Sequence, residues 1–250
     1  MNNKPFHAPL QNPKKILDVG CGTGAMTSLL ASLYPEAQVI GVDIAAVQEG
    51  RHEQQSNLEY VQGDIRELVK SGADPRFQQG SFDFVFNRLL LLGMVDWPGY
   101  IASVVSLLRP EGWLEIQEPS MSLWTAQGQK IQDSWEFWPA FKADMKAIGL
   151  DGEIGEKLAD YFRETGKLEK VAESRYPFLP DADPERPELD GLGANIMSIF
   201  VVAVRKVCGD KRGEEEVNKM EQEIRSRWEK GFSKGDQFTM YVAIGQKEAA

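Results

Sequence analysis

Apolar residues follow two alternating patterns over the first half of the chain. Short, nearly continuous apolar runs are typical of buried strands. Five such runs occur, at 15–19, 39–43, 58–61, 82–86 and 113–116. Between them the apolar positions recur every three or four residues, as they do at Met26, Leu29, Leu30 and Leu33, which predicts amphipathic helices. Strands that alternate with helices in this way predict βαβ units and a parallel sheet with right-handed crossovers.

The second half of the chain carries longer helical patterns between fewer strands. The stretch 120–166 is helical in pattern and rich in aromatic residues. Its aromatic side chains could form a wall for a flat apolar substrate, but we favour a role in the core. Helices are predicted at 192–207 and 214–232, the second with a solvated charged face, and strands at 168–176 and 238–244. The Pro- and acid-rich run 179–188 reads as an exposed loop.

Composition excludes several classes of protein. The 250 residues carry a formal net charge of -10, which disfavours nucleic acid and anionic membranes as partners. The longest apolar stretch, 196–204, is too short to span a bilayer, and no signal peptide is visible at the start. Two cysteines, Cys21 and Cys208, form neither a disulfide framework nor a zinc site. We therefore expect a single cytoplasmic α/β domain without a metal.

A glycine-rich turn follows the first predicted strand, at 20–24, where a backbone without Cβ atoms can approach a ligand closely. With Ala25 in the last position, the turn also matches a loose form of the glycine-rich sequence pattern found in dinucleotide-binding proteins. Asp18 argues against a dinucleotide, because a carboxylate there would repel a pyrophosphate, whereas it suits a cofactor with a sulfonium and an α-amino group. Asp43 could accept the ribose hydroxyls and Asp64 the adenine amino group, although either carboxylate could instead cap a helix.

The run 16–24, Ile-Leu-Asp-Val-Gly-Cys-Gly-Thr-Gly, resembles the first motif of the class I S-adenosylmethionine methyltransferases nearly residue for residue. The stretches 41–43, 63–65, 82–85 and 108–113 are similar to the motifs that follow in that family, in the same order and spacing. The resemblance covers residues 15–118. It implies a Rossmann-like, doubly wound sheet that binds S-adenosylmethionine and releases S-adenosylhomocysteine.

A narrower resemblance concerns 8–10, 96–98 and 112–118, which are similar to the fungal secondary-metabolism methyltransferases related to the velvet-complex regulator. It implies that the terminal strand near Tyr241 inserts antiparallel to complete a seven-stranded, mostly parallel sheet. Such proteins carry a longer helical segment before the first strand, whereas 14 residues precede Lys15 here. We therefore expect part of the usual lid to be absent.

These patterns and resemblances define a single methyltransferase domain over 1–250. We expect a cofactor-binding half at 14–118, helical lid and substrate-side elements at 119–165 and 176–235, and a closing strand at 237–246. The residues predicted to bind the cofactor are Asp18, Gly20, Cys21, Gly22, Gly24, Asp43, Ile44, Asp64, Ile65 and Asn87.

Three polar residues are candidates for the substrate side. Asn87 and Arg88 follow the fourth predicted strand, where the chain should pass under the sulfonium; the alternatives are a strand cap and a surface salt bridge. Glu118 ends the fifth strand and could remove a proton from the acceptor, or it could be a buried structural carboxylate. Arg88 and Glu118 are the predicted catalytic residues.

Neither histidine is expected at the site. His7 should lie near the N-terminal end of the first strand, opposite the cofactor edge, and His52 falls in a polar helix or loop. Alignment of donor and acceptor is then the main catalytic effect, with neither a metal nor a histidine base.

The predicted function is methyl transfer to the O, N or S atom of a small molecule, a secondary metabolite. Two alternatives keep the same cofactor site: a regulatory protein that acts through a protein partner, and a cyclase or pericyclase that binds the cofactor without transferring its methyl group. A dinucleotide oxidoreductase is disfavoured by Asp18.

Overall fold

The computed structural model describes residues 4–47, 55–180 and 192–249. The predicted loop at 179–188 lies almost wholly outside the described residues, as does His52. The elements in chain order are β1 (Lys15–Val19), α1 (Ala25–Leu33), β2 (Gln38–Asp43), β3 (Leu58–Gln62), α2 (Ile65–Ser71), η1 (Pro75–Phe77), β4 (Phe82–Arg88), α3 (Trp97–Leu107), β5 (Leu108–Trp124), η2 (Ile131–Ser134), α4 (Trp138–Ala147), η3 (Ile154–Lys157), α5 (Leu158–Glu164), β6 (Leu168–Phe178), α6 (Leu192–Cys208), α7 (Glu214–Lys230) and β7 (Gln237–Lys247).

The strands form one seven-stranded sheet in the order β3-β2-β1-β4-β5-β7-β6. The first five strands in this order pair in parallel, and β7 pairs antiparallel with both β5 and β6. This arrangement confirms the predicted Rossmann-like fold with its antiparallel terminal strand. Strand order reverses between β1 and β4, so the crevice between their carboxyl ends is where an open α/β sheet binds ligands.

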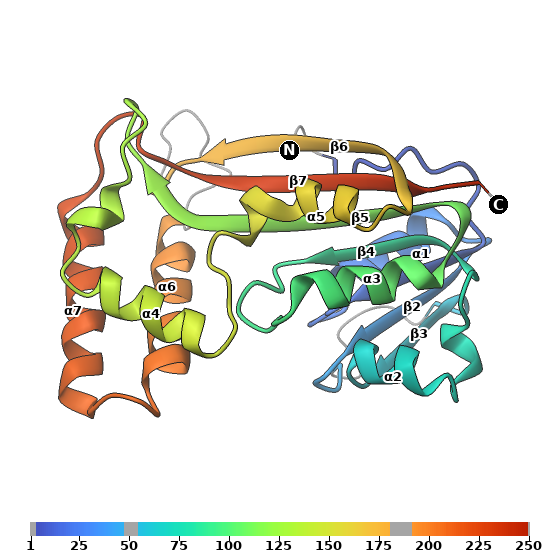
Figure 1. Ribbon diagram of the computed structural model, residues 1–250, viewed down its shortest axis with the longest axis horizontal. Coiled ribbons are helices and arrows are strands. Elements are labelled where there is room, and N and C mark those ends of the chain that lie inside the picture. The colour runs from blue at the N-terminus through green and yellow to red at the C-terminus, as the bar shows by residue number, and fades with distance from the viewer. Residues whose placement is uncertain (1–3, 48–54, 181–191, 250) are drawn as a thin grey trace.

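Apolar side chains pack on both faces of the sheet. On one face, α2, α3 and α5 cover the larger core, as Figure 1 shows, and this core continues among α4, α6 and α7. On the other face, α1 and the N-terminal segment 4–10 cover a smaller core, in which Phe6 packs on Phe84 and Tyr34. The helices α4, α6 and α7 gather beyond one end of the sheet (Figure 1), as the predicted helical insertions require.

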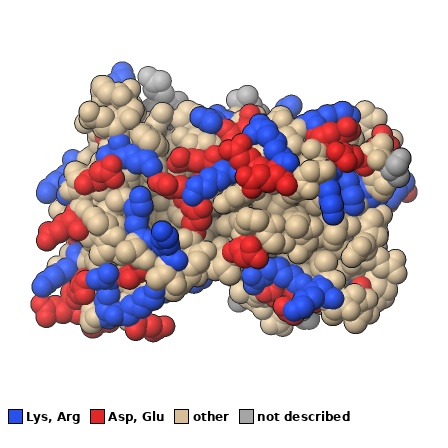
Figure 2. Space-filling view, viewed as in Figure 1, with Lys and Arg blue, Asp and Glu red and all other residues tan. Residues whose placement is uncertain are grey.

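The aromatic stretch is mainly core. Trp135 is 1% exposed, and its ring contacts those of Phe137, Trp138, Phe200 and Trp228. The buried residues of α7 lie on the predicted apolar face. No helix in the described part of the chain is long and apolar enough to cross a membrane. On the face shown in Figure 2, acidic and basic side chains are interspersed around an uncharged central area.

Most strands extend past the ranges that the apolar pattern predicted, and two of these extensions concern candidate site residues or a change of element. The strand β4 includes Asn87 and Arg88 as its last residues. The strand β5 begins at Leu108 and runs to Trp124, so residues 120–124, expected to be helical, are extended. The physical reason is pairing with β7, since Ser120 aligns with Thr239 and Trp124 with Gln237. Ser120 and Ser122 are polar although they are buried in this part of β5. The apolar pattern that predicts buried strands is therefore interrupted here.

Candidate cofactor site

The glycine turn is fixed by hydrogen bonds to the neighbouring strand. The backbone N–H groups of Gly20 and Cys21 donate to the carbonyl of Val42, at 2.7 and 3.1 Å. Gly20, Gly22 and Gly24 all have positive φ angles, 66°, 54° and 81°, which favour glycine. A Cβ on Gly22 would meet nothing within 4 Å, so its backbone faces open space. The turn therefore presents bare backbone at the switch point of the sheet.

Asp18 lies beneath this turn and is 2% exposed. Its Oδ2 accepts a hydrogen bond of 2.6 Å from the Thr27 hydroxyl. Burial raises the pKa of the Asp18 carboxyl to about 7, although the Thr27 hydrogen bond and the positive charge of Arg88 both oppose the rise. A buried carboxyl with one hydroxyl partner can receive a cationic group from a ligand.

Asp43 joins the second strand to the glycine turn. Its Oδ2 accepts from the Gly22 N–H at 2.8 Å, and its Oδ1 accepts from the Ala45 N–H at 2.9 Å. Each carboxylate oxygen has two lone pairs, so both oxygens can still accept a ligand hydroxyl. Ile44, beside it, is 73% exposed. Cys21 is buried near both carboxyls, and burial raises the pKa of its thiol to about 12, so it remains protonated.

Asp64 caps the helix that follows the third strand. Its Oδ1 accepts from the Arg66 N–H at 2.9 Å, and its Oδ2 forms an ion pair with the Arg66 guanidinium at 2.7 Å. The Arg66 hydrogen bond lowers the pKa of the Asp64 carboxyl. The helix-cap alternative is thus realised at this residue, while the side chain stays one-third exposed and open to a further donor.

A hollow of about 160 Å³ connects these strand ends. It is lined by Val19, Gly20, Val42, Asp43, Ile44, Gly63, Asp64, Ile65, Arg66, Leu90, Gly93 and Met94. Five of the predicted cofactor residues are among them. Among the lining residues that were not predicted from the sequence, Leu90, Gly93 and Met94 belong to the segment 89–96 after β4. The apolar run of four leucines directly after the strand, 89–92, was the available signal.

The predicted residues Asn87 and Glu118 lie on the other side of that segment, fully buried. The Glu118 carboxylate accepts from the backbone N–H groups of Leu90 and Leu91, at 2.6 and 3.1 Å, and the Asn87 carbonyl accepts from Tyr100 Oη at 2.9 Å. Burial raises the pKa of the Glu118 carboxyl to about 8. These contacts fit a structural carboxylate that holds the segment 89–96 against the sheet.

Arg88 and His7 lie on the opposite face of the sheet from Glu118. Arg88 is exposed at the end of β4, aligned with Gln117 of β5. His7 contacts Glu115, which aligns with Phe86 and through it with Asp18. The expected position of His7, at the N-terminal end of the first strand, is therefore wrong. The apolar residues of the segment 4–10 pack across the sheet face, which carries His7 to the level of Asp18.

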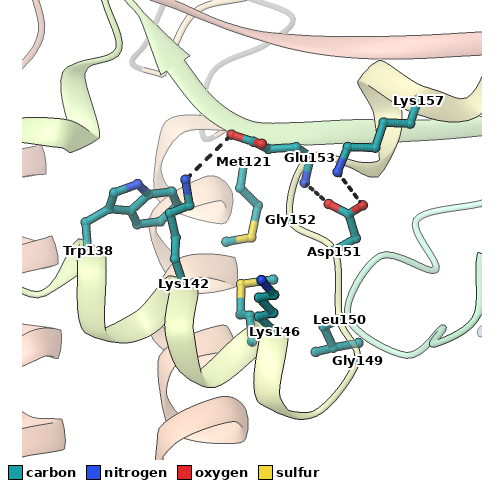
Figure 3. A pocket seen from close by; sticks show the side chains of 11 residues that line it. Met121, Trp138, Lys142, Lys146, Gly149, Leu150, Asp151, Gly152, Glu153 and Lys157 are labelled. Atoms are coloured by element: carbon teal, nitrogen blue, oxygen red, sulfur yellow. Dashed lines mark hydrogen bonds and ion pairs between the residues drawn. The ribbon is translucent and has the colours of Figure 1, made fainter.

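A second cavity, of about 360 Å³, lies within the segment 121–157 (Figure 3). Its apolar part is formed by Met121, Trp138, Met145 and Leu150, all nearly buried. Lys142 and Lys157 stand at its edge and pair with Glu153 and Asp151, at 4.0 and 2.6 Å. Gly149 lines this cavity and also approaches Val95, so the segment 89–96 separates it from the cofactor hollow.

In the described residues, no group of three His, Cys, Asp or Glu side chains is placed to hold a metal ion.

Comparisons with known proteins agree with this geometry. The family model described as "Methyltransferase domain" matches residues 3–166. Trans-aconitate 2-methyltransferase of Deinococcus radiodurans is 36% identical over 108 residues, which are 42% of this chain and 38% of that protein. Methyltransferase str2 of Strobilurus tenacellus is 26% identical over 82% of this chain and 71% of its own length. The secondary metabolism regulator laeA of Coprinopsis cinerea is 30% identical over 73% of this chain and 47% of its own length.

Solved structures show the same fold at low sequence identity. Phosphoethanolamine N-methyltransferase 2 of Haemonchus contortus, solved with S-adenosylhomocysteine, has a TM-score of 0.57 and 17% identity over 96% of this chain and 50% of that one. The [4+2]-cyclase SpnF has a TM-score of 0.54 and 18% identity over 96% of this chain and 77% of that one. The chain thus spans between 38% and 71% of the three curated relatives. With the family model covering well over half of its residues, the chain belongs to the methyltransferase domain family of Rossmann-like, S-adenosylmethionine-dependent proteins.

Proposed function

We propose that the protein transfers a methyl group from S-adenosylmethionine to a small-molecule acceptor, a secondary metabolite. One observation carries the proposal: Asp18, Asp43 and Asp64 lie at or just past the carboxyl ends of three successive strands, where Asp43 accepts from the Gly22 N–H and Asp64 lines the same hollow as Gly20. No pyrophosphate would be stable beside the buried Asp18 carboxylate, whereas an ammonium group would be.

The residues present fit this cofactor. The turn 20–24 and Asp18 would hold the methionine half, Asp43 the ribose hydroxyls, and Asp64 the adenine amino group beside Ile44 and Ile65. S-adenosylmethionine supplies a methyl group on a sulfonium, which is already a good leaving group. The chain's own residues therefore mainly need to align the acceptor with that methyl group and to exclude water.

The substrate side is proposed to be formed by 119–165 and 176–235, whose helices gather beyond the carboxyl end of β5 (Figure 1). The net charge of -10 supports a small-molecule acceptor over nucleic acid. The two cysteines are free and buried, as expected in a reducing, cytoplasmic compartment.

Two alternatives are favoured by specific relatives. The chain resembles proteins named as a secondary metabolism regulator and, in fold, a [4+2]-cyclase. Either role would use a bound cofactor without consuming it. The amount of S-adenosylhomocysteine formed therefore separates both alternatives from methyl transfer.

The test uses methyl-labelled S-adenosylmethionine and a small-molecule extract of the organism that carries the gene. We expect a labelled product that forms in a 1:1 ratio with S-adenosylhomocysteine, because each transfer releases one molecule of it. The matched control is Gly22→Val, which should yield neither. Cofactor binding by the parent protein without any S-adenosylhomocysteine above the control would contradict methyl transfer and favour the two alternatives.

A further inference from the structure

Three residues from distant parts of the chain form a continuous hydrogen-bonded series on the sheet face that carries Arg88. Glu115 of β5 contacts His7 Nδ1 through its Oε1, at 3.3 Å. His7 Nε2 lies 2.7 Å from the hydroxyl of Tyr176 in β6. The His7 side chain is 14% exposed and Glu115 is fully buried. The order carboxylate, imidazole, hydroxyl is the order found where a histidine accepts a proton from a hydroxyl group.

The environment of Glu115 decides the direction of these hydrogen bonds. Its Oε2 accepts from the backbone N–H groups of His7 and Ala8, at 2.7 and 2.8 Å, and its Oε1 accepts from Gln117 Nε2 at 2.7 Å. A carboxylate with this many donors is an acceptor toward the imidazole as well, so the His7 proton resides on Nδ1. Nε2 then carries a lone pair, and the Tyr176 hydroxyl donates to it.

Sheet register places this series beside the cofactor edge. Asp18, Phe86 and Glu115 are aligned across β1, β4 and β5, so Glu115 is at the level of Asp18 and two strands away, roughly 10 Å. Tyr176 aligns with Met240 and so with Pro119, near the carboxyl end of β6. Side chains at alternate positions of a strand share a face, so Glu115, Gln117 and the aligned Arg88 lie on the same face.

Gln117 adds an independent sign of a ligand in this region. Its side chain is fully buried, and its Nε2 also donates to the Pro5 carbonyl at 3.1 Å. Its Oε1 has no donor within the described residues. A buried acceptor without a donor is costly, by about 1–3 kcal/mol, unless a ligand or an ordered water supplies one. Gln117 Oε1 is therefore an acceptor on this face that a ligand donor could satisfy.

We propose that Tyr176, His7 and Glu115 form a proton relay that deprotonates the methyl acceptor, and that the acceptor group is therefore a hydroxyl, phenolic or alcoholic. This inference rests on the proposed methyl transfer, names its acceptor class, and replaces the expectation from the sequence that no histidine acts as a base. Tyr176 is the residue that contacts the acceptor. His7 and Glu115 act through it as positioning residues.

The proton steps balance as follows. The acceptor oxygen forms its new bond to the methyl carbon while its O–H bond breaks, and the electron pair of the carbon–sulfur bond stays on sulfur. The acceptor proton passes to Tyr176 Oη as the Tyr176 proton passes to His7 Nε2. The imidazolium that results is stabilised by the Glu115 carboxylate and then loses its proton to water. The positive charge of the sulfonium is thereby transferred to the imidazole.

The first test needs no acceptor. The chain has only two histidines, so a nitrogen-15 spectrum of the imidazoles is assigned by comparison with a His7→Gln variant. We expect His7 to be protonated on Nδ1 with a hydrogen-bonded, unprotonated Nε2, and expect Tyr176→Phe to shift the Nε2 signal. A His7 ring protonated on Nε2, or an Nε2 signal that does not respond to Tyr176→Phe, would overturn the relay.

The second test uses methyl-labelled S-adenosylmethionine with a panel of phenols, the matching benzyl alcohols, and the matching benzoic acids, whose carboxylates have no proton to lose. We expect phenols to be methylated, and Tyr176→Phe to lower kcat about a hundred-fold, the order of magnitude for a general base, with KM and cofactor affinity unchanged. Tyr34→Phe, at the end of α1, keeps the ring that contacts Phe6 and is the matched control, which should keep the parent rate. Added imidazole should partly restore a His7→Gly variant.

The outcomes distinguish this inference from the proposed function. Methylation of benzoic acids alone, or of phenols at the parent rate by Tyr176→Phe, would overturn the relay and leave methyl transfer standing. Cofactor binding without transfer to any phenol or alcohol of the panel would overturn the acceptor class. A parent protein that binds no S-adenosylmethionine would overturn the proposed function itself.

Discussion

Asp18 is the buried residue through which we propose that the site selects its cofactor. It is 2% exposed, has the Thr27 hydroxyl as its hydrogen-bond donor, and titrates near pH 7 because burial disfavours its charged form. A ligand ammonium at this position would stabilise the carboxylate and lower its pKa in the complex. Binding of such a ligand must then release a proton at pH values below about 7, which couples cofactor affinity to pH.

We therefore predict that affinity for S-adenosylhomocysteine, which keeps the ammonium group, is constant above pH 8. Affinity should fall as the pH drops through 7, by up to about ten-fold per pH unit, because protonated Asp18 must first ionise. Calorimetric titrations between pH 5.5 and 8.5 measure this slope. Asp18→Asn should abolish it. Glu118→Gln should keep it, since the Glu118 pKa is also raised, to about 8, but its side chain lies on the other face. A slope unchanged in Asp18→Asn would refute the ammonium contact.

Some residues of the site could be predicted from the sequence, and others could not. Asp18 and Asp43 could be predicted because each stands at a fixed offset from a glycine turn or a strand end. Glu115 could not, because it is one polar residue in an apolar strand and its partner His7 is 108 positions away. Glu118 was expected to end the fifth strand, but β5 continues to Trp124, and its contacts with Leu90 and Leu91 fit the structural alternative.

At the scale of elements, the connection from β1 through the glycine turn into α1 forms the centre of the proposed cofactor site. The turn conformation requires residues that tolerate positive φ, which is why the motif was readable from sequence. The residues at which strands end were harder to predict from the sequence. The strand β5 extends to Trp124 because β7 offers backbone partners, and no local pattern encodes a partner more than 100 residues later.

Gly22 and Gly128 provide a matched pair for testing this turn. Both have positive φ, 54° and 78°, and a Cβ on either would meet nothing within 4 Å. Substitution by valine should therefore strain the backbone equally and lower thermal stability by similar amounts in the two variants. Only Gly22→Val should abolish binding of S-adenosylhomocysteine, because only its side chain would stand where the backbone meets the ligand. Equal, parent-like affinity in both folded variants would show that the turn does not contact the cofactor.

At the scale of the whole molecule, the order β4-β5-β7-β6 and the N-terminal segment bring His7, Glu115 and Tyr176 to one face. The parallel part of the sheet was predictable from the alternation of strands and helices, whereas the seven-stranded topology with its antiparallel terminal strand was implied by the family resemblance. The position of the N-terminal segment was not, since its packing across the sheet depends on contacts of Phe6 with Phe84 and Tyr34 that no spacing along the chain reveals.

The central claim, that the strand-end hollow binds S-adenosylmethionine, is tested most directly by calorimetry on two aspartate variants. Asp43 and Asp74 both accept backbone N–H groups through their carboxylates, but only Asp43 lines the hollow. The parent and Asp74→Ala should bind S-adenosylmethionine equally and NAD negligibly. Asp43→Ala should bind S-adenosylmethionine ten- to a hundred-fold more weakly, an estimate of about 1–3 kcal/mol for unpaired ribose hydroxyls. Unchanged affinity in folded Asp43→Ala, or a parent that binds NAD in preference to S-adenosylmethionine, would contradict the account.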